Sequence, residues 1–128
     1  MNGTIQPAHD SWSARVGRRE PQSPLAVTFC RPPATLRLAG VIDESTYPVL
    51  RRALAKAAMA GDDALRVDMA EVEFCDLAGL RLIVRLAGSG RAAVSQVTIV
   101  HLPAHLAEIM HILGWAGAPG LVLLEPGR

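Results

Sequence analysis

Apolar residues recur at two distinct spacings from residue 25 onward, and these spacings predict an alternation of strands and helices. Alternating or short continuous apolar segments predict five strands: Leu25–Cys30, Thr35–Ala39, Leu65–Met69, Val97–Leu102 and Leu121–Leu124. Two consecutive prolines in the segment Arg31–Ala34 force a turn, so the first two strands are expected to form a hairpin. Val72 and Phe74 are expected to anchor the loop that follows the third strand.

Three further segments carry apolar residues at helical spacing, together with residue types that begin and end helices. The expected helices lie between Thr46 and Gly61, from Leu77 to Ala87, and between Pro103 and Gly114. Pro48 is acceptable in the first turn, where its missing N–H has no intrahelical partner to lose. Gly61 is expected to end the first helix, and Asp76 is expected to cap the second.

The order of these elements is ββαβαβαβ, which predicts an α/β fold: a mixed sheet of four to five strands with helices packed on it. The later βαβ units require parallel neighbouring strands with right-handed crossovers. Residues 1–24 contain three prolines and no apolar periodicity, and we expect them to form a disordered or loosely attached tail. Residues 25–126 are expected to form one domain.

The composition supports a folded globular domain, since half of the residues are apolar and a fifth are charged. Aromatic residues make up only 4%, which argues against single-stranded nucleic-acid binding, because that activity needs stacking platforms. The net charge of +1 does not call for a polyanionic partner. Without a signal-peptide pattern or a membrane-length apolar run, the sequence predicts a soluble cytoplasmic protein. Cys30 and Cys75 are then expected as small buried apolar residues rather than a disulfide.

Signals for catalysis or metal binding are weak. Cys75 has no histidine in the sequence pattern to serve as its base, and His101, His105 and His111 do not share a helical face with metal-ligand spacing. Glycine-rich phosphate-binding motifs are also missing. We therefore expect no enzymatic activity, no cofactor and no metal site.

Two segments carry the strongest motif. The first runs from Leu38 to Asp43 and reads LAGVID, a strand that ends in Gly-x-hydrophobic-Asp before a helix; the second reads DLAGL from Asp76 to Leu80, after the third strand. With the third helix ending at Gly114, this chain resembles the STAS family, and within it the anti-sigma-factor antagonists. The resemblance covers residues 25–125 and implies a non-enzymatic switch module.

The resemblance also implies a mechanism and a partner. A STAS antagonist binds a serine-kinase-type anti-sigma factor through the start of its second helix and so frees a sigma factor. The kinase then phosphorylates the second serine of a Asp-Ser-Ser-Gly-Leu motif, and the added charge breaks the complex. Here Ala78 replaces that serine and Leu77 replaces the other. Two consequences stay open: the domain binds its partner permanently, or it is regulated in another way.

Helical geometry places Ala78, Arg81 and Arg85 on one stripe of the second helix. This stripe is either a docking surface for an acidic partner or a solvated helix face, and the family resemblance favours docking. Asp43 and Asp76 are expected at the same rim of the sheet, as helix caps and as partner contacts. The predicted partner-binding residues are Asp43, Ser45, Thr46, Asp76, Leu77, Ala78, Gly79, Arg81 and Arg85.

Two other functions remain as alternatives. Some STAS proteins serve lipid-transporting ABC ATPases and also carry Ala-Gly-Leu at this point, although after Asp-Thr rather than after the Asp76-Leu77 found here. A third possibility is a small-ligand sensor that uses the rim near Asp43. Ser45 and Thr46 are either helix caps or alternative phosphorylation sites, with capping favoured. The oligomeric state is expected to be a monomer or a weak dimer.

Overall fold

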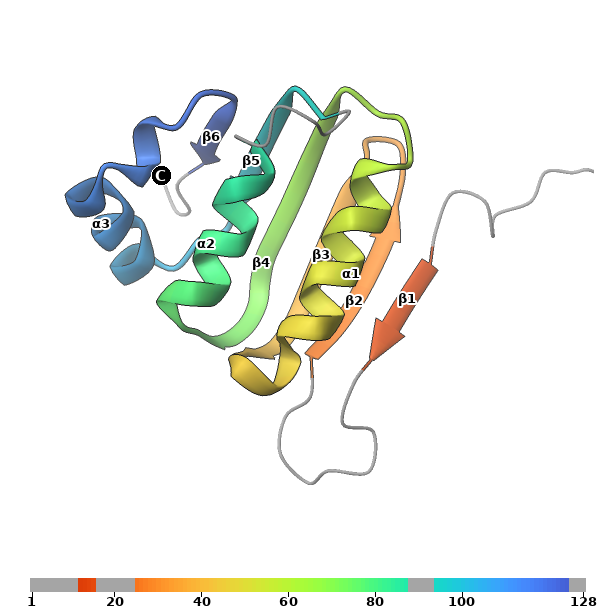
Figure 1. Cartoon of the computed structure of the whole chain (residues 1–128), viewed down its shortest axis with the longest axis horizontal. Helices are drawn as coiled ribbons and strands as arrows, with labels where there is room; N and C mark the ends of the chain where they lie inside the picture. The colour runs from red at the N-terminus through yellow and green to blue at the C-terminus, as the bar shows by residue number, and fades with distance from the viewer. Residues whose placement is uncertain (1–11, 16–24, 88–93, 125–128) are drawn as a thin grey trace, which may run out of the picture.

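Six strands form one sheet in the order β1-β2-β3-β4-β5-β6 in the computed structural model, which describes residues 12–15, 25–87 and 94–124 (Figure 1). The strands are β1 (Trp12–Arg15), β2 (Leu25–Cys30), β3 (Thr35–Ile42), β4 (Ala64–Cys75), β5 (Gln96–Val100) and β6 (Leu121–Leu124). The helices are α1 (Tyr47–Ala58), α2 (Leu77–Ala87) and α3 (Ala104–Leu113), with short 3-10 turns η2 (Glu44–Thr46) and η3 (Trp115–Gly117). The predicted α/β fold is confirmed.

The sheet has an antiparallel part and a parallel part. β1, β2 and β3 pair antiparallel, as expected for a chain that turns at two prolines between β2 and β3. β3, β4, β5 and β6 pair parallel, because a helical connection carries the chain back before each new strand. The first strands therefore form the expected hairpin, and the later units form the expected parallel part.

The core lies between the sheet and the helices. On β2 the alternate residues Leu25, Val27 and Phe29 are buried, and the helices contribute buried residues at helical spacing. The buried helix residues include Leu50, Leu54, Leu80, Ile83, Leu106 and Met110. In Figure 1, α1 and α2 lie on the same side of the sheet, so its other face carries the remaining alternate positions, which mix polar residues such as Arg37 and Asp68 with apolar ones such as Val100 and Leu124. We call this second side the open face.

The ends of β4 and α1 differ from those expected from the sequence. β4 continues to Cys75, so Val72 and Phe74 lie in a strand and not in a loop, and its pairing with β3 shifts register twice on the way. α1 ends at Ala58, and Gly61, with φ of +96°, lies in the turn beyond it. These differences arise where one element's pairing with a neighbour overrides its local pattern.

β1 lies within residues 1–24, which were expected to form a disordered or loosely attached tail, so that expectation is wrong for residues 12–15. β1 pairs with β2, and the Trp12 ring stacks on Phe29 with ring centroids 5.5 Å apart. The Lys56 ammonium of α1 lies 4.6 Å from the centroid of the Trp12 ring, a cation–π distance. One aromatic side chain thus fastens the strand to both the sheet and a helix. The rest of the tail, residues 1–11 and 16–24, lies outside the described residues.

Within residues 12–15, 25–87 and 94–124, no helix is long and apolar enough to cross a membrane. Both cysteines are free thiols, Cys75 buried and Cys30 half-buried. The expectation that each is a buried apolar residue therefore holds for Cys75 only. Burial, together with the negative charge of Asp76, raises the pKa of the Cys75 thiol to about 12.

Candidate functional site

The ends of β3 and β4 bring the two predicted aspartates to one rim of the sheet. Ile42 and Cys75 lie opposite each other in the parallel pair, so Asp43 and Asp76 follow at the same edge. The Asp76 N–H donates to the Ile42 carbonyl oxygen at 3.1 Å, which joins the two strand ends directly. Each aspartate then begins the helical segment that comes after it.

Asp43 caps the turn η2. Its Oδ1 accepts hydrogen bonds from the backbone N–H and the hydroxyl of Ser45, at 3.0 and 2.7 Å. In return, the hydroxyl oxygen of Thr46 accepts a hydrogen bond from the Asp43 N–H at 3.0 Å. This reciprocal pattern satisfies backbone groups that a helix start leaves unpaired. Asp43 is therefore the cap of η2 and Thr46 completes its capping box, whereas Ser45 caps no helix and Thr46 makes no side-chain capping bond to α1.

Thr46 lies beneath the surface of the rim, where its hydroxyl is hydrogen-bonded to the backbone. Its side chain is only 4% exposed, and its Oγ lies 3.0 Å from the Val41 carbonyl oxygen and 3.1 Å from that of Asp43. A buried hydroxyl with these partners is neither a surface contact nor an accessible phosphorylation site. Ser45 is exposed, although its hydroxyl is already bonded to Asp43.

Substituting Thr46 with valine is expected to lower the free energy of unfolding by about 1–3 kcal/mol, because valine keeps the shape but leaves buried backbone groups unpaired. Urea unfolding of the two proteins measures the difference. Ser45→Ala, which removes an exposed hydroxyl from the same turn, is the matched control and is expected to cost less. Equal stability of the Thr46→Val variant and the native protein would show that the Thr46 hydroxyl carries no net stabilisation.

Asp76 joins the starts of α1 and α2. Its Oδ1 accepts from the Gly79 N–H at 2.8 Å, which caps α2, and its Oδ2 accepts from the Tyr47 hydroxyl at 2.7 Å. The hydrogen bond to Asp76 raises the pKa of Tyr47 to about 12, and partial burial and the negative charge of the carboxylate add to the shift. Sequence patterns did not single out Tyr47, because its partner lies 29 residues away.

Gly79 lets α2 approach the end of β3 closely. It is buried, and a Cβ at this position would overlap with Cγ2 of Ile42 and lie 3.1 Å from Asp76 Oδ1. Like Thr46, Gly79 therefore shapes the rim without forming its surface. Thr46 and Gly79 were predicted to contact the partner, but both are buried and cannot do so in this structure.

Ala78, Arg81 and Arg85 line one small hollow between α1 and α2, together with Leu82, Tyr47 and Arg51. The hollow measures about 160 Å³. The predicted stripe on α2 is thus real as a surface, and α1 adds two residues that sequence analysis missed. Tyr47 and Arg51 stand four residues apart on one side of α1, and the Arg51 guanidinium lies 5.9 Å from the centre of the Tyr47 ring. Asp43 and Ser45 do not line this hollow.

The three arginines make the hollow basic. Within the part of the chain that the structure describes, no acidic group lies within ion-pair distance of Arg51, Arg81 or Arg85. Leu77, at the start of α2, is exposed to 44%, which is high for a large apolar side chain, and it lies one helical turn from Arg81. We call this surface, formed by Tyr47, Arg51, Leu77, Ala78, Arg81 and Arg85, the basic rim.

The three histidines among the described residues do not come together as metal ligands. His105 and His111 are exposed on α3, while His101 lies beyond the end of β5. Among the described residues, no three His, Cys, Asp or Glu side chains come together as metal ligands.

The fold has counterparts among known proteins. Residues 25–125 match the family model described as "Mlab, STAS domain". The chain belongs to the STAS domain family. A capped α2 that begins at the end of a parallel strand stands where the family motif was expected, with Asp76-Leu-Ala-Gly-Leu80 at its start.

Two solved structures share the STAS fold. One is an anti-sigma factor antagonist from Mycobacterium paratuberculosis, with a TM-score of 0.58, 17% identity, and coverage of 92% of this chain and 90% of that one. The other is the anti-sigma factor antagonist SpoIIAA in its unphosphorylated form, with a TM-score of 0.52, 13% identity, and coverage of 73% and 80%. At these identities the likeness establishes the fold. Curated proteins gave no match to the sequence.

Proposed function

We propose that this STAS domain regulates a protein partner by binding it at the basic rim, without catalysis. The observation that carries the proposal is the hollow between α1 and α2, where three arginines surround the exposed Ala78. A hollow of about 160 Å³ is too small for an ordinary cofactor but suits one or two side chains from another protein.

The charge and the apolar residues of the rim define the kind of partner. Arginines that form no ion pair within the described residues favour carboxylates, which their guanidinium groups bind through paired hydrogen bonds. The exposed side chain of Leu77 supplies apolar area of the kind found in the centres of interfaces. The partner is therefore an acidic protein surface with an apolar centre.

The partner we propose is a serine-kinase-type anti-sigma factor, whose capture releases a sigma factor. The start of α2 is the position that the resemblance to anti-sigma-factor antagonists assigns to partner binding. Two structures with the same fold are themselves described as anti-sigma factor antagonists, which supports this choice over other STAS functions.

Ala78 determines how the proposed switch is controlled. It is exposed at the first turn of α2, where a serine would be accessible to a kinase, but it has no hydroxyl. The domain is thus either permanently competent for binding or regulated elsewhere. Ala78→Ser supplies this hydroxyl, and we expect the copurified kinase to phosphorylate the variant if the start of α2 fits the kinase's active site.

Substituting Ala78 with aspartate is expected to weaken partner binding about tenfold or more, which is about 1.4 kcal/mol or more. The carboxylate would neutralise Arg81 and Arg85 within the same helix face and repel an acidic partner. The measurement is purification of the tagged protein from its native cell, with the copurifying proteins identified by mass spectrometry and their affinity then measured by titration calorimetry.

The matched control is Ala104→Asp, which places the same charge on an exposed alanine at the first turn of α3. It is expected to leave binding unchanged. A histidine-kinase-like ATPase of the anti-sigma type that is retained by the control and lost with Ala78→Asp supports the proposal. Equal binding by both variants contradicts it.

An accessory subunit of a lipid-transporting ABC ATPase is the second candidate. The observation that favours it is the run Ala78-Gly79-Leu80, which STAS proteins of that class share. The same purification separates the two, because a transporter ATPase and permease would then copurify instead of a kinase-like ATPase.

A further inference from the structure

The open face of the sheet has its own hollow, on the side away from α1 and α2. It measures about 580 Å³ and crosses β2 to β6, with the two prolines of the β2–β3 turn at one end. Its lining residues are Cys30, Pro32, Pro33, Thr35, Arg37, Arg66, Asp68, Val100, His101 and Leu124. We call it the open-face hollow. Its volume falls in the range of roughly 300–1,000 Å³ that is typical of small-molecule sites.

Strand register explains why these side chains meet. Arg37 lies opposite Asp68, Asp68 opposite Val100, and Val100 opposite Leu124, so one row runs across four strands. Arg66 belongs to the next row, opposite Thr35. The hollow therefore has a charged half over β3 and β4 and an apolar half over β5 and β6.

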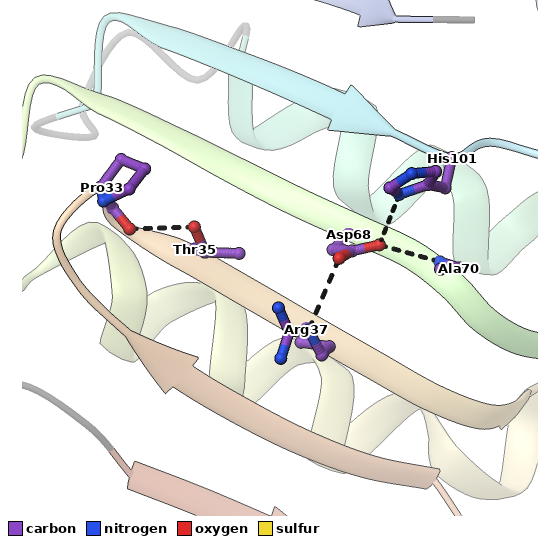
Figure 2. A network of polar contacts seen from close by, with 6 residues as sticks. All are labelled: Pro33, Thr35, Arg37, Asp68, Ala70 and His101. Atoms are coloured by element: carbon purple, nitrogen blue, oxygen red, sulfur yellow. Dashed lines mark hydrogen bonds and ion pairs between the residues drawn. The ribbon is translucent and has the colours of Figure 1, made fainter. Parts of the chain in front are cut away.

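Asp68 organises the charged half, as Figure 2 shows. Its Oδ1 accepts from the Ala70 N–H at 2.9 Å and lies 3.1 Å from Nδ1 of His101, while its Oδ2 lies 3.5 Å from Nε of Arg37. Burial alone would raise the pKa of Asp68, but the hydrogen bond from Ala70 and the contacts with His101 and Arg37 outweigh it and lower the pKa. Asp68 is therefore ionised and holds the neighbouring groups in place.

The arginines retain unused binding capacity. The Arg37 side chain is 52% exposed and meets Asp68 only through Nε. Arg66 is exposed, and no residue that the structure describes pairs with it. Two guanidinium groups against one carboxylate leave a net positive charge in the hollow, which favours an anion.

The backbone of His101 points to the same place. It has φ of +61°, and it is the non-glycine residue with positive φ among those described. A side chain in this conformation carries a backbone cost that glycine would avoid, and such costs gather at functional sites. Glycine at this position would lack the imidazole, which contacts Asp68 where both residues line the hollow.

We propose that the open-face hollow binds a small organic anion, with its carboxylate or phosphate group held by Arg37 and Arg66 and its apolar part against Val100 and Leu124. This site is separate from the basic rim and does not depend on the proposed partner. A small molecule fits better than a protein or nucleic acid, because the positive charge is confined to a concave site with only two arginines.

Titration calorimetry with phenyl phosphate tests the site, since this probe combines an anionic group with an apolar ring. We expect saturable binding at one site, and an affinity about tenfold lower for Arg66→Gln and for Arg37→Gln, since a charged hydrogen-bonded pair is lost. Arg81→Gln, on the helix side of the protein, is the matched control and should bind as the native protein does. Inorganic phosphate is expected to bind more weakly, because it lacks the apolar part.

The two cysteines give a second readout of where the probe binds. Cys30 lines the hollow, whereas Cys75 is buried and its pKa of about 12 keeps its thiol protonated and unreactive. Saturating phenyl phosphate should therefore slow the alkylation of Cys30 by iodoacetamide several-fold. Circular dichroism confirms that each variant is folded.

Phenyl phosphate binding that depends on both arginines and protects Cys30 supports the site. The proposal is overturned by any one of three results: no saturable binding, equal affinity for inorganic phosphate and phenyl phosphate, or binding that leaves Cys30 alkylation unchanged. Failure of the partner experiment would leave these outcomes unaffected, so the two proposals are tested separately.

Discussion

Gly79→Val is expected to lower the free energy of unfolding by about 3 kcal/mol, at the upper end of overpacking effects. For a domain of this size, that loss lowers the melting temperature by about 10–20 °C. The reason is steric: an added Cβ would overlap with Cγ2 of Ile42, which is fully buried at the end of β3. Neither group can move away cheaply, because Ile42 is packed in the core and α2 is held by its cap at Asp76.

Gly117→Val is the matched control for this substitution. Gly117 lies in η3, and a Cβ there would have no heavy atom within 4 Å. It is expected to change the free energy of unfolding by less than about 1 kcal/mol. Thermal and urea unfolding of both variants measure the difference. A Gly79→Val protein that melts within a few degrees of the native one would mean that α2 does not approach β3 as closely as described.

The single tyrosine is expected to ionise with a pKa of about 12 in the folded protein, and near its ordinary value of 10.0 once Asp76 is changed to asparagine. This is a shift of nearly a hundredfold in proton affinity. The Asp76 carboxylate accepts a hydrogen bond from the protonated Tyr47 hydroxyl, and its negative charge would repel the tyrosinate. A neutral amide would not repel the tyrosinate, so the pKa of Tyr47 falls. Because Tyr47 is the only tyrosine, tyrosinate absorbance reports on it alone.

The control for this titration is Asp43→Asn, which changes the other capping aspartate of the rim and does not contribute to the raised pKa of Tyr47. Its titration should match that of the native protein. Because the folded state holds the Tyr47 proton more tightly than the unfolded chain, the contribution to stability is complete below pH 10 and is lost as the pH rises toward 12. Circular dichroism recorded in parallel separates ionisation from unfolding. A native pKa near 10 would show that the bond to Asp76 is not formed.

Local sequence patterns correctly predicted the helices whose ends and buried positions are set by their own residues. α2 begins and ends as predicted, because Asp76 caps it and its apolar residues repeat at helical spacing. α3 ends at Gly114, whose φ of +80° is a conformation that glycine adopts without cost. The stripe of Ala78, Arg81 and Arg85 also followed from helical geometry alone.

Features that depend on strand order could not be predicted from the sequence. Asp68, His101 and Arg37 come from three neighbouring strand regions, and nothing in their spacing along the chain indicates that they meet. The bond from Tyr47 to Asp76 likewise joins two helix starts that only the tertiary fold brings together. For β4 a signal was present, since Val72 and Phe74 alternate with Glu71 and Glu73, but the two acidic residues made the segment resemble a loop.

The strand β1 has a consequence for where this domain can be cut. The family match begins at residue 25, so a fragment trimmed to that boundary would lose Trp12 and the whole of β1. The outer edge of β2 would then present bare peptide groups, and such an edge is a template for pairing with another chain. The four residues of β1 therefore cover the backbone edge of β2 from Ala26 to Phe29, and one tryptophan fastens them there.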